Sequence, residues 1–172
     1  PSWDERLELY LAALEEASLA ERAVLDLGCG TGILAIYAAK VGARPVVGLD
    51  IDAVSVRVAR ENAQRNGVAD QVSFGHGSLG IQGYELEEGA ISFPGPFDVI
   101  AVNILAETVS ALTPAIVAHL SDHGQVIASG IIKEREGSVS AAWANAGLHV
   151  AERHQDGDWV ALIGVKGHPE TN

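Results

Sequence analysis

The sequence predicts an α/β fold built on a mostly parallel sheet that ends in an antiparallel hairpin. Short, nearly continuous apolar runs alternate with segments of helical periodicity, a pattern typical of strands buried on both faces of a parallel sheet. Helical segments separate successive strands, which predicts right-handed crossovers in a doubly wound sheet. The last two strand-like runs are joined only by Gln155-Asp156-Gly157, a link too short to hold a helix.

The elements follow one another in a regular order. Leu7, Leu11 and Leu14 have helical spacing in a segment rich in Glu and Ala, which predicts an opening helix. The predicted strands are residues 23–27, 45–50, 72–75, 97–102, 126–129, 148–154 and 158–165. The predicted helices between them are residues 33–41, 53–66, 107–120 and 133–146. Gly147 follows the last helix and is expected to adopt the left-handed conformation that ends it.

These elements predict a single domain. Residues 1–22 form its N-terminal helical segment, residues 23–166 hold the sheet, and residues 167–172 are a tail. Residues 77–96 are the one sizeable insertion, and they follow a strand at the sheet edge where loops carry function.

Composition narrows the class of protein. A chain of 172 residues that is 48% hydrophobic can bury a core without disulfides. Its single cysteine rules out an intrachain bridge. Because proteins without disulfides are typical of reducing compartments, a cytoplasmic location is expected. The net charge of −12 disfavours nucleic acid as a partner and favours a basic protein. No apolar run approaches the roughly 20 residues that span a bilayer, so no membrane association is expected.

A glycine-rich turn follows the first predicted strand and opens the next helix. In Asp26-Leu-Gly28-Cys-Gly30-Thr-Gly32 the third glycine comes one position earlier than in the dinucleotide fingerprint, which disfavours NAD. The carboxylate of Asp26 would repel a pyrophosphate and suits a cationic ligand such as S-adenosylmethionine. Asp50 ends the second strand, where a carboxylate can accept both ribose hydroxyls. The alternative is a tight turn that binds no ligand.

Other marked residues have structural interpretations beside functional ones. Cys29 is either a nucleophile at a helix start or a small residue that fits the turn. Trp143 is expected to pack a helix on the sheet. The cluster Glu85–Glu88 is a solvated face or a docking surface for a basic protein. No metal site is expected, because the histidines lack metal-ligand spacing and are mostly surface or strand-end residues; they are His76, His119, His123, His149, His154 and His168.

The motifs resemble those of a known superfamily. The glycine turn with Asp50 is similar to the first two motifs of class I S-adenosylmethionine-dependent methyltransferases, whose Rossmann-like, three-layer fold has a seven-stranded sheet and a terminal hairpin. Residues 60–68, Asn103-Ile-Leu-Ala106, Ser129-Gly-Ile-Ile132 and Gly157-Asp-Trp159-Val-Ala-Leu162 narrow the resemblance to the PrmA-like methyltransferases of ribosomal protein L11. The resemblance covers residues 24–165.

This resemblance implies roles for named residues. The cofactor S-adenosylmethionine is expected to contact Asp26, Gly28, Gly30, Gly32, Asp50, Ile51, Ser78, Leu79 and Asn103. Ser78 and Leu79 follow the third strand and are either at the adenine or ordinary loop turn residues. Asn103 is the predicted catalytic residue that positions the methyl acceptor, although an amide there can also cap the next helix. Trp159 is assigned either to the acceptor pocket or to the core.

The sequence around Asn103 bears on the acceptor. Related enzymes that methylate flat amide or base nitrogens carry Asn-Pro-Pro-aromatic at this place, whereas this chain has Ile104 and Leu105, which favours an aliphatic amine. The leading hypothesis is protein N-methylation of ribosomal protein L11. A small-molecule methyltransferase and a non-catalytic binding module remain as alternatives. Because the family carries a separate N-terminal recognition domain, the chain alone is expected to methylate L11 poorly.

Overall fold

The computed structural model describes residues 3–80, 83–84 and 95–167. The helices are α1 (Trp3–Glu16), α2 (Ile33–Lys40), α3 (Ala53–Arg65), α4 (Ala106–His119), the 3-10 turn η1 (Lys133–Arg135) and α5 (Glu136–Asn145). The strands are β1 (Val24–Leu27), β2 (Val46–Asp50), β3 (Val72–His76), β4 (Leu79–Gly80), β5 (Gly83–Tyr84), β6 (Phe97–Asn103), β7 (Leu120–Ile132), β8 (Leu148–Asp156) and β9 (Trp159–Lys166).

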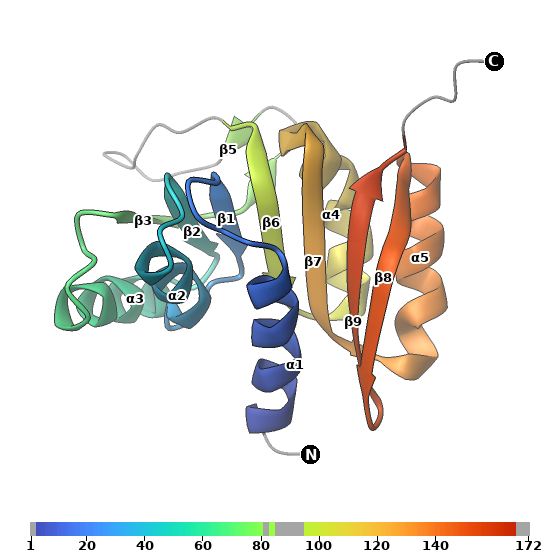
Figure 1. Cartoon of the computed structure of the whole chain (residues 1–172), viewed down its shortest axis with the longest axis horizontal. Coiled ribbons are helices and arrows are strands. Elements are labelled where there is room, and N and C mark those ends of the chain that lie inside the picture. Colours follow the sequence, from blue (N-terminus) through green and yellow to red (C-terminus); the bar gives the residue numbers. More distant parts are fainter. Residues whose placement is uncertain (1–2, 81–82, 85–94, 168–172) are drawn as a thin grey trace.

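Seven strands form one sheet in the order β3-β2-β1-β6-β7-β9-β8 (Figure 1). Neighbouring strands from β3 to β7 pair in parallel, while β9 pairs antiparallel with both β7 and β8. This confirms the predicted mostly parallel sheet with a terminal antiparallel hairpin. The strand order reverses between β1 and β6, and the crevice at the carboxyl ends of such strands is where open α/β sheets bind ligands.

Helices cover both faces of the sheet and enclose two cores. One core lies beneath α1, α2 and α3, and the other lies beneath α4 and α5 (Figure 1). Trp143 of α5 is fully buried, as predicted, and its ring occupies the space where a side chain on Gly164 of β9 would sit. Each face of the central strands therefore packs against a helix, which explains their nearly continuous apolar sequence.

The differences from the predicted elements are local. β7 begins at Leu120, earlier than expected, because Leu120 pairs with Phe97 before an irregularity in the ladder. The predicted helix 133–146 starts as a 3-10 turn and becomes α-helical at Glu136. The hairpin turn is Gly157 and Asp158, since Asp156 still pairs with Trp159. Gly147 has a φ of 84°, as predicted for the end of the last helix.

Part of the predicted insertion forms a small additional sheet of β4 and β5, which the sequence did not predict. The Glu85–Glu88 cluster and His168 lie outside the described residues. In the described part of the chain, no helix has both the length and the apolar character that crossing a membrane requires.

Candidate functional site

Two adjoining pockets open at the carboxyl edge of the sheet. The first, called here the β2-side pocket, has a volume of about 260 Å³. Its lining residues are Leu27, Gly28, Asp50, Ile51, Gly77, Ser78, Ile104, Leu105, Thr108 and Leu112. The second, the β7-side pocket, has a volume of about 440 Å³. Its lining residues are Asn103, Ile104, Leu105, Ala106, Glu107, Gly130, Ile132, Arg135 and Trp159. Ile104 and Leu105 belong to both pockets and form the wall between them.

The glycine turn is tied to the end of β2 by backbone hydrogen bonds. The amides of Gly28 and Cys29 both donate to the Leu49 carbonyl, at 2.8 and 2.9 Å. Gly28, Gly30 and Gly32 all have positive φ, a conformation that glycine adopts without steric cost. A Cβ on Gly28 would collide with Ile104, so the turn and the shared wall pack closely.

Gly30 and Gly32 have different surroundings within this turn. A Cβ on Gly32 would lie 2.9 Å from both Ala59 and Phe74, so this glycine is required by packing. A Cβ on Gly30 would meet no atom within 4 Å among the described residues. The open side of Gly30 therefore leaves room for a ligand to approach the backbone.

Asp50 braces the glycine turn and lines the β2-side pocket. One carboxylate oxygen accepts from the Gly30 amide at 2.8 Å, and the other accepts from the Asp52 amide at 2.9 Å. A carboxylate has about four lone-pair sites, so each oxygen can accept one further hydrogen bond. Two oxygens that are held by backbone amides and still have spare acceptor capacity suit a pair of neighbouring hydroxyl groups.

Asp26 lies beneath the turn, 1% exposed, and is not part of either pocket lining. Its Oδ2 accepts from the Ala35 amide at 3.1 Å, while its Oδ1 has no hydrogen-bond partner among the described residues. Burial raises the pKa of this carboxyl to about 7, helped by the nearby charge of Asp50 and opposed by the Ala35 bond. An unpartnered, buried carboxylate oxygen favours a cationic or hydrogen-bond-donating ligand.

Cys29 is buried within the same turn. Burial raises the pKa of its thiol, and the negative charges of Asp26 and Asp50 raise it further. The thiol is therefore protonated at neutral pH, and the packing interpretation of Cys29 is favoured over the nucleophilic one.

Asn103 ends β6 and lines the β7-side pocket. No side chain caps α4, whose N-cap residue is Leu105, so the capping alternative for Asn103 is not supported. Its Oδ1 lies where a side chain on Gly130 would be, 2.6 Å from the ideal Cβ position. Gly130 thus leaves space for the Asn103 amide, which makes no hydrogen bond to another described residue.

The opposite wall of this pocket comes from β7, η1 and β9. Trp159 pairs with Ile132 in the sheet, and both side chains line the pocket. At the mouth, Arg135 Nε lies 3.3 Å from Glu107 Oε1, and both side chains are exposed. An amide, an indole and an ion pair therefore surround one apolar-walled pocket.

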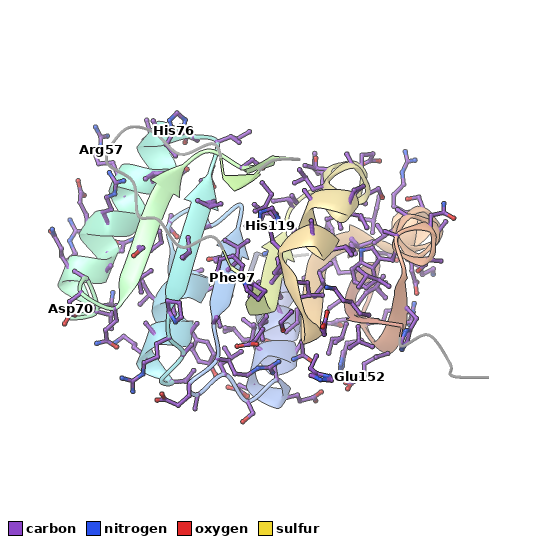
Figure 2. The ribbon with its side chains drawn as sticks, turned by 90° about the horizontal axis from the view of Figure 1, so that it is seen from above. Arg57, Asp70, His76, Phe97, His119 and Glu152 are labelled. Atoms are coloured by element: carbon purple, nitrogen blue, oxygen red, sulfur yellow. The ribbon has the colours of Figure 1, made fainter. Side chains whose placement is uncertain are left out.

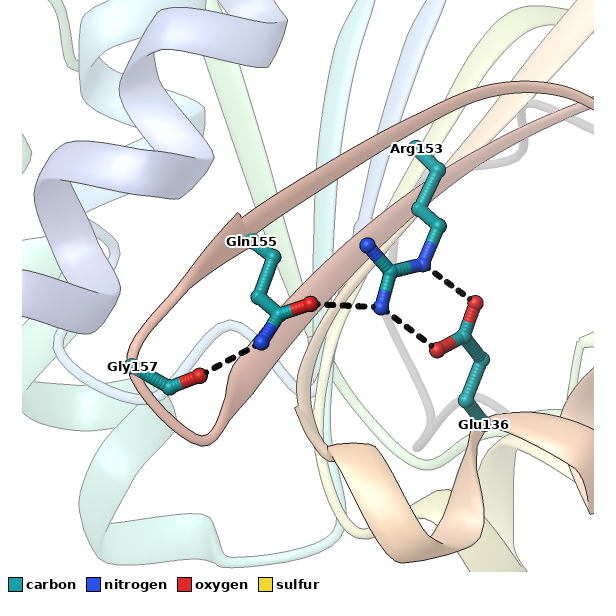
Figure 3. Close-up of polar contacts among 4 residues, drawn as sticks. All are labelled: Glu136, Arg153, Gln155 and Gly157. Atoms are coloured by element: carbon teal, nitrogen blue, oxygen red, sulfur yellow. Dashed lines mark hydrogen bonds and ion pairs between the residues drawn. The ribbon is translucent and has the colours of Figure 1, made fainter.

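A polar chain holds this wall together behind the pocket (Figure 3). Arg153 of β8 donates to both carboxylate oxygens of Glu136, at 2.6 and 2.9 Å, and this pairing lowers the pKa of the Glu136 carboxyl. Arg153 also donates to Gln155, which donates to the Gly157 carbonyl at 2.7 Å. Glu136 follows Arg135, and Gly157 precedes Trp159 by two residues. These hydrogen bonds therefore link two parts of the pocket lining.

Three exposed apolar side chains line the pockets. They are Ile51, Leu105 and Ile132, which lie at or just after the carboxyl ends of β2, β6 and β7. Ile51 is 78% exposed and Leu105 is 71% exposed. A concentration of exposed apolar residues around a pocket is typical of a surface that a ligand or partner covers.

The fold thus places the predicted residues in three groups. Gly28, Asp50, Ile51 and Ser78 line the β2-side pocket, whereas Asn103 and Trp159 line the β7-side pocket. Asp26, Gly32 and Leu79 are buried supports beneath the surface. Gly30 belongs to none of these groups, because it is half-buried in the turn and lines neither pocket. The sequence did not assign the remaining lining residues to the site; they are Leu27, Gly77, Ile104, Leu105, Ala106, Glu107, Thr108, Leu112, Gly130, Ile132 and Arg135. Of these, Gly130 and Ile132 belong to the Ser129–Ile132 motif, which could have indicated them.

Two of the histidines have hydrogen bonds that explain their positions. His76, near the upper edge of the view in Figure 2, has its Nε2 2.9 Å from the Ile51 carbonyl oxygen. His119 is buried in the last turn of α4, where Nδ1 lies 2.7 Å from the Ala115 carbonyl oxygen. The expectation of a surface or strand-end position is therefore wrong for His119.

Comparison with known proteins gives consistent matches over most of the chain. The family model described as ribosomal protein L11 methyltransferase (PrmA) matches residues 7–167. The ribosomal protein L11 methyltransferase of Chloroflexus aurantiacus is 43% identical over 169 residues, covering 90% of this chain and 52% of that protein. That of Pelotomaculum thermopropionicum is 42% identical over 154 residues, covering 90% of this chain and 47% of that protein. The chain spans about half the length of the curated relatives it matches.

Solved structures give the same picture. The ribosomal protein L11 methylase of Lactobacillus delbrueckii subsp. bulgaricus superposes with a TM-score of 0.82 at 32% identity, covering 95% of this chain and 80% of that one. An RNA methyltransferase from Salinibacter ruber, crystallised with S-adenosyl-L-homocysteine, has a TM-score of 0.69 at 22% identity, covering 100% and 97%. The second similarity shows the fold alone.

Proposed function

The chain belongs to the ribosomal protein L11 methyltransferase (PrmA) family, and on that premise we propose that it is an S-adenosylmethionine-dependent protein N-methyltransferase domain. The observation that carries the proposal is the pair of adjoining pockets with Ile104 and Leu105 between them. A reaction that joins two ligands needs two sites that meet, and methyl transfer from a cofactor to an amine is such a reaction.

The residues of the β2-side pocket fit the cofactor. Beside the pocket lining, the open side of Gly30 allows close approach to the backbone. Asp26 is buried beneath the turn, so it would act on a positive charge of the cofactor through space and not by contact. Asp50 has spare acceptor capacity for two ribose hydroxyls, while Ile51 and Ser78 would flank the adenine. When bound, S-adenosylmethionine supplies a methyl group made electrophilic by its sulfonium.

The residues of the β7-side pocket fit an aliphatic amine. The Asn103 amide oxygen would accept a hydrogen bond from the acceptor nitrogen and orient its lone pair. Leu105, Ile132 and Trp159 offer an apolar channel for the methylene chain of a lysine. Such an amine must lose a proton before it attacks, and an apolar wall favours its neutral form.

The proposed substrate is ribosomal protein L11, as the family name indicates. The net charge of −12 would attract a basic protein, and the exposed apolar residues around the pockets would be covered when it docks. Because ribosomal proteins are made and assembled in the cytoplasm, the proposal assigns the chain to that compartment.

Transfer of a radiolabelled methyl group to purified L11 and to a panel of free amines tests this function. The wild-type chain is expected to methylate an amine, and Asn103→Ala to lower turnover by about 10²-fold with cofactor affinity nearly unchanged. Asn145→Ala, an exposed asparagine at the end of α5, is the matched control. A full-length relative is expected to methylate L11 faster than this chain does. Equal losses of turnover and affinity in Asn103→Ala, or no transfer to any acceptor, would contradict the proposal.

A further inference from the structure

Three metal-ligating side chains meet outside the lining of both pockets. Glu16 is the last residue of α1, and Glu152 and His154 lie on β8. One potential ligand atom from each side chain lies within 4.8 Å of the other two. Figure 2 shows Glu152 near the lower edge of the view and His76, which is beside the β2-side pocket, near the upper edge. None of the three residues lines either pocket.

The pleat of β8 explains why these side chains meet. The ladder between β8 and β9 shifts register between Val150 and Glu152, and alternation resumes after the shift. Arg153 points to the face that carries α5, where it binds Glu136. Glu152 and His154 therefore share the opposite face, where the end of α1 packs.

The distances within this cluster do not fit hydrogen bonding. His154 Nε2 lies 3.5 Å from Glu152 Oε2 and 3.7 Å from Glu16 Oε2, and both separations are long for a hydrogen bond. Nε2 is itself buried and has no hydrogen-bond partner among the described residues. A ring nitrogen enclosed by two carboxylates without a hydrogen bond to either is an arrangement that a bound atom would complete.

The same distances fit the coordination sphere of a small metal ion. Ligand atoms about 2.1 Å from a tetrahedral zinc ion are separated from one another by about 3.4 Å. Two of the observed separations, 3.5 and 3.7 Å, are close to that value. The third, between the two carboxylates, is at most 4.8 Å, so the exposed glutamate side chains would have to move closer together. The two glutamate side chains are more than half exposed, so solvent can supply the fourth ligand.

We propose that Glu16, Glu152 and His154 form a binding site for a divalent transition-metal ion of the zinc class. One imidazole and two carboxylates suit zinc, cobalt or nickel, whereas magnesium and calcium require six or more oxygen ligands. The competing explanation is that a protonated His154 forms ion pairs with both carboxylates. The sequence did not indicate this site, because Glu16 comes from the first helix and the other two ligands come from β8, near the end of the chain.

Metal binding would join the end of α1 to the edge strand β8. These elements are far apart in the sequence, and a ligand that binds only the folded state stabilises it. The site would therefore hold the N-terminal helix on the sheet without taking part in chemistry at the pockets.

Calorimetric titration of zinc chloride into the tag-free chain tests the proposal. We expect saturable binding of one ion and an increase in Tm on adding zinc, with neither effect from magnesium. His154→Gln is expected to abolish both, and Glu16→Gln or Glu152→Gln to weaken zinc binding by at least about tenfold. His149→Gln is the matched control, because His149 is an exposed histidine on the same strand but outside the cluster.

Circular dichroism of each variant without metal confirms that it is folded. Absence of saturable zinc binding to the wild-type chain would overturn the proposal in favour of the ion pairs. Unchanged zinc affinity in folded His154→Gln would overturn it equally, because the ion would then be bound elsewhere.

Discussion

The two pockets at the carboxyl edge of the sheet are built in different ways. Part of the β2-side pocket is a continuous turn whose shape is set by glycines and by backbone hydrogen bonds to the end of β2. The β7-side pocket is assembled from three separate segments, namely residues 103–107, 130–135 and Trp159. The first pocket therefore depends on local backbone conformation, and the second depends on how distant elements pack. Substitutions that damage one should leave the other largely intact.

The pH dependence of unfolding tests the buried support of the β2-side pocket. The pKa of Asp26 is about 7 in the folded chain and 3.8 for an exposed carboxyl, so the folded state binds its proton more tightly. The resulting stabilisation is complete below pH 3.8 and is lost as the pH rises through 7. It amounts to as much as about 4 kcal/mol.

Denaturant unfolding of wild type and Asp26→Asn between pH 4 and 8 measures this effect. The stability of the wild type relative to Asp26→Asn should fall across that range, whereas replacement of the exposed Asp122 by Asn should give a profile parallel to wild type. Parallel profiles for wild type and Asp26→Asn would show that the pKa of Asp26 is not raised in the folded chain.

Two alanine substitutions in the glycine turn separate fold from ligand binding. Both Gly30 and Gly32 have positive φ, which costs an alanine about 1–2 kcal/mol. Gly32→Ala also overpacks against Ala59 and Phe74, for a total loss of about 3 kcal/mol. Gly30→Ala should destabilise less and yet weaken S-adenosylmethionine binding more. Denaturant unfolding and calorimetry measure the two effects, and the reverse ranking would show that Gly30 does not face the ligand.

The difference between the two pockets also explains how much of each could be predicted from the sequence. Gly28, Gly30, Gly32 and Asp50 could be assigned because a glycine turn after a strand is a local pattern and the next strand ends beside it. The unpartnered oxygen of Asp26 could not be predicted, since it depends on how the surrounding side chains pack. Neither could the contact of Ile104 with Gly28, because it joins segments that are distant in sequence.

The β7-side pocket was predicted less completely for a physical reason. Asn103 and Trp159 were identified from motifs, but Glu107 and Arg135 are ordinary surface charges until η1 brings them together. The predicted helix 133–146 did not indicate η1, since a 3-10 turn and the first turn of an α-helix have similar sequence preferences.

A glycine on β7 tests the acceptor side. A Cβ on Gly130 would lie 2.6 Å from the Asn103 Oδ1 atom, so Gly130→Ala should displace that amide. Turnover should fall by about 10²-fold while the cofactor Kd changes little. Gly147→Ala is the control, because Gly147 also has a positive φ and a Cβ there meets no described atom within 4 Å. Steady-state kinetics measures kcat, and calorimetry measures the cofactor Kd. A kcat equal to that of the wild type would contradict the proposed role of Asn103 at the acceptor site.

The smallest expected effect comes from the polar chain behind the β7-side pocket. Arg153→Ala frees the hairpin from Glu136, so KM for the amine should rise and Tm should fall slightly. Arg44→Ala removes an exposed ion pair with Glu21, which lies near the amino ends of β1 and β2, away from the pockets. This substitution should leave KM unchanged. The same KM in Arg153→Ala and Arg44→Ala would mean that the hydrogen bonds of Arg153 do not position the pocket wall.

Calorimetric titration of S-adenosylmethionine into wild type, Asp50→Ala and Asp52→Ala tests the central claim most directly. Asp52 caps α3 two residues after Asp50, so its loss removes a nearby carboxylate without altering the β2-side pocket lining. We expect one-to-one binding to wild type, a loss of at least about tenfold in Asp50→Ala, and an affinity within about twofold of wild type in Asp52→Ala. Undetectable binding to the wild-type chain at millimolar cofactor, or equal losses in the two variants, would contradict the cofactor site described above.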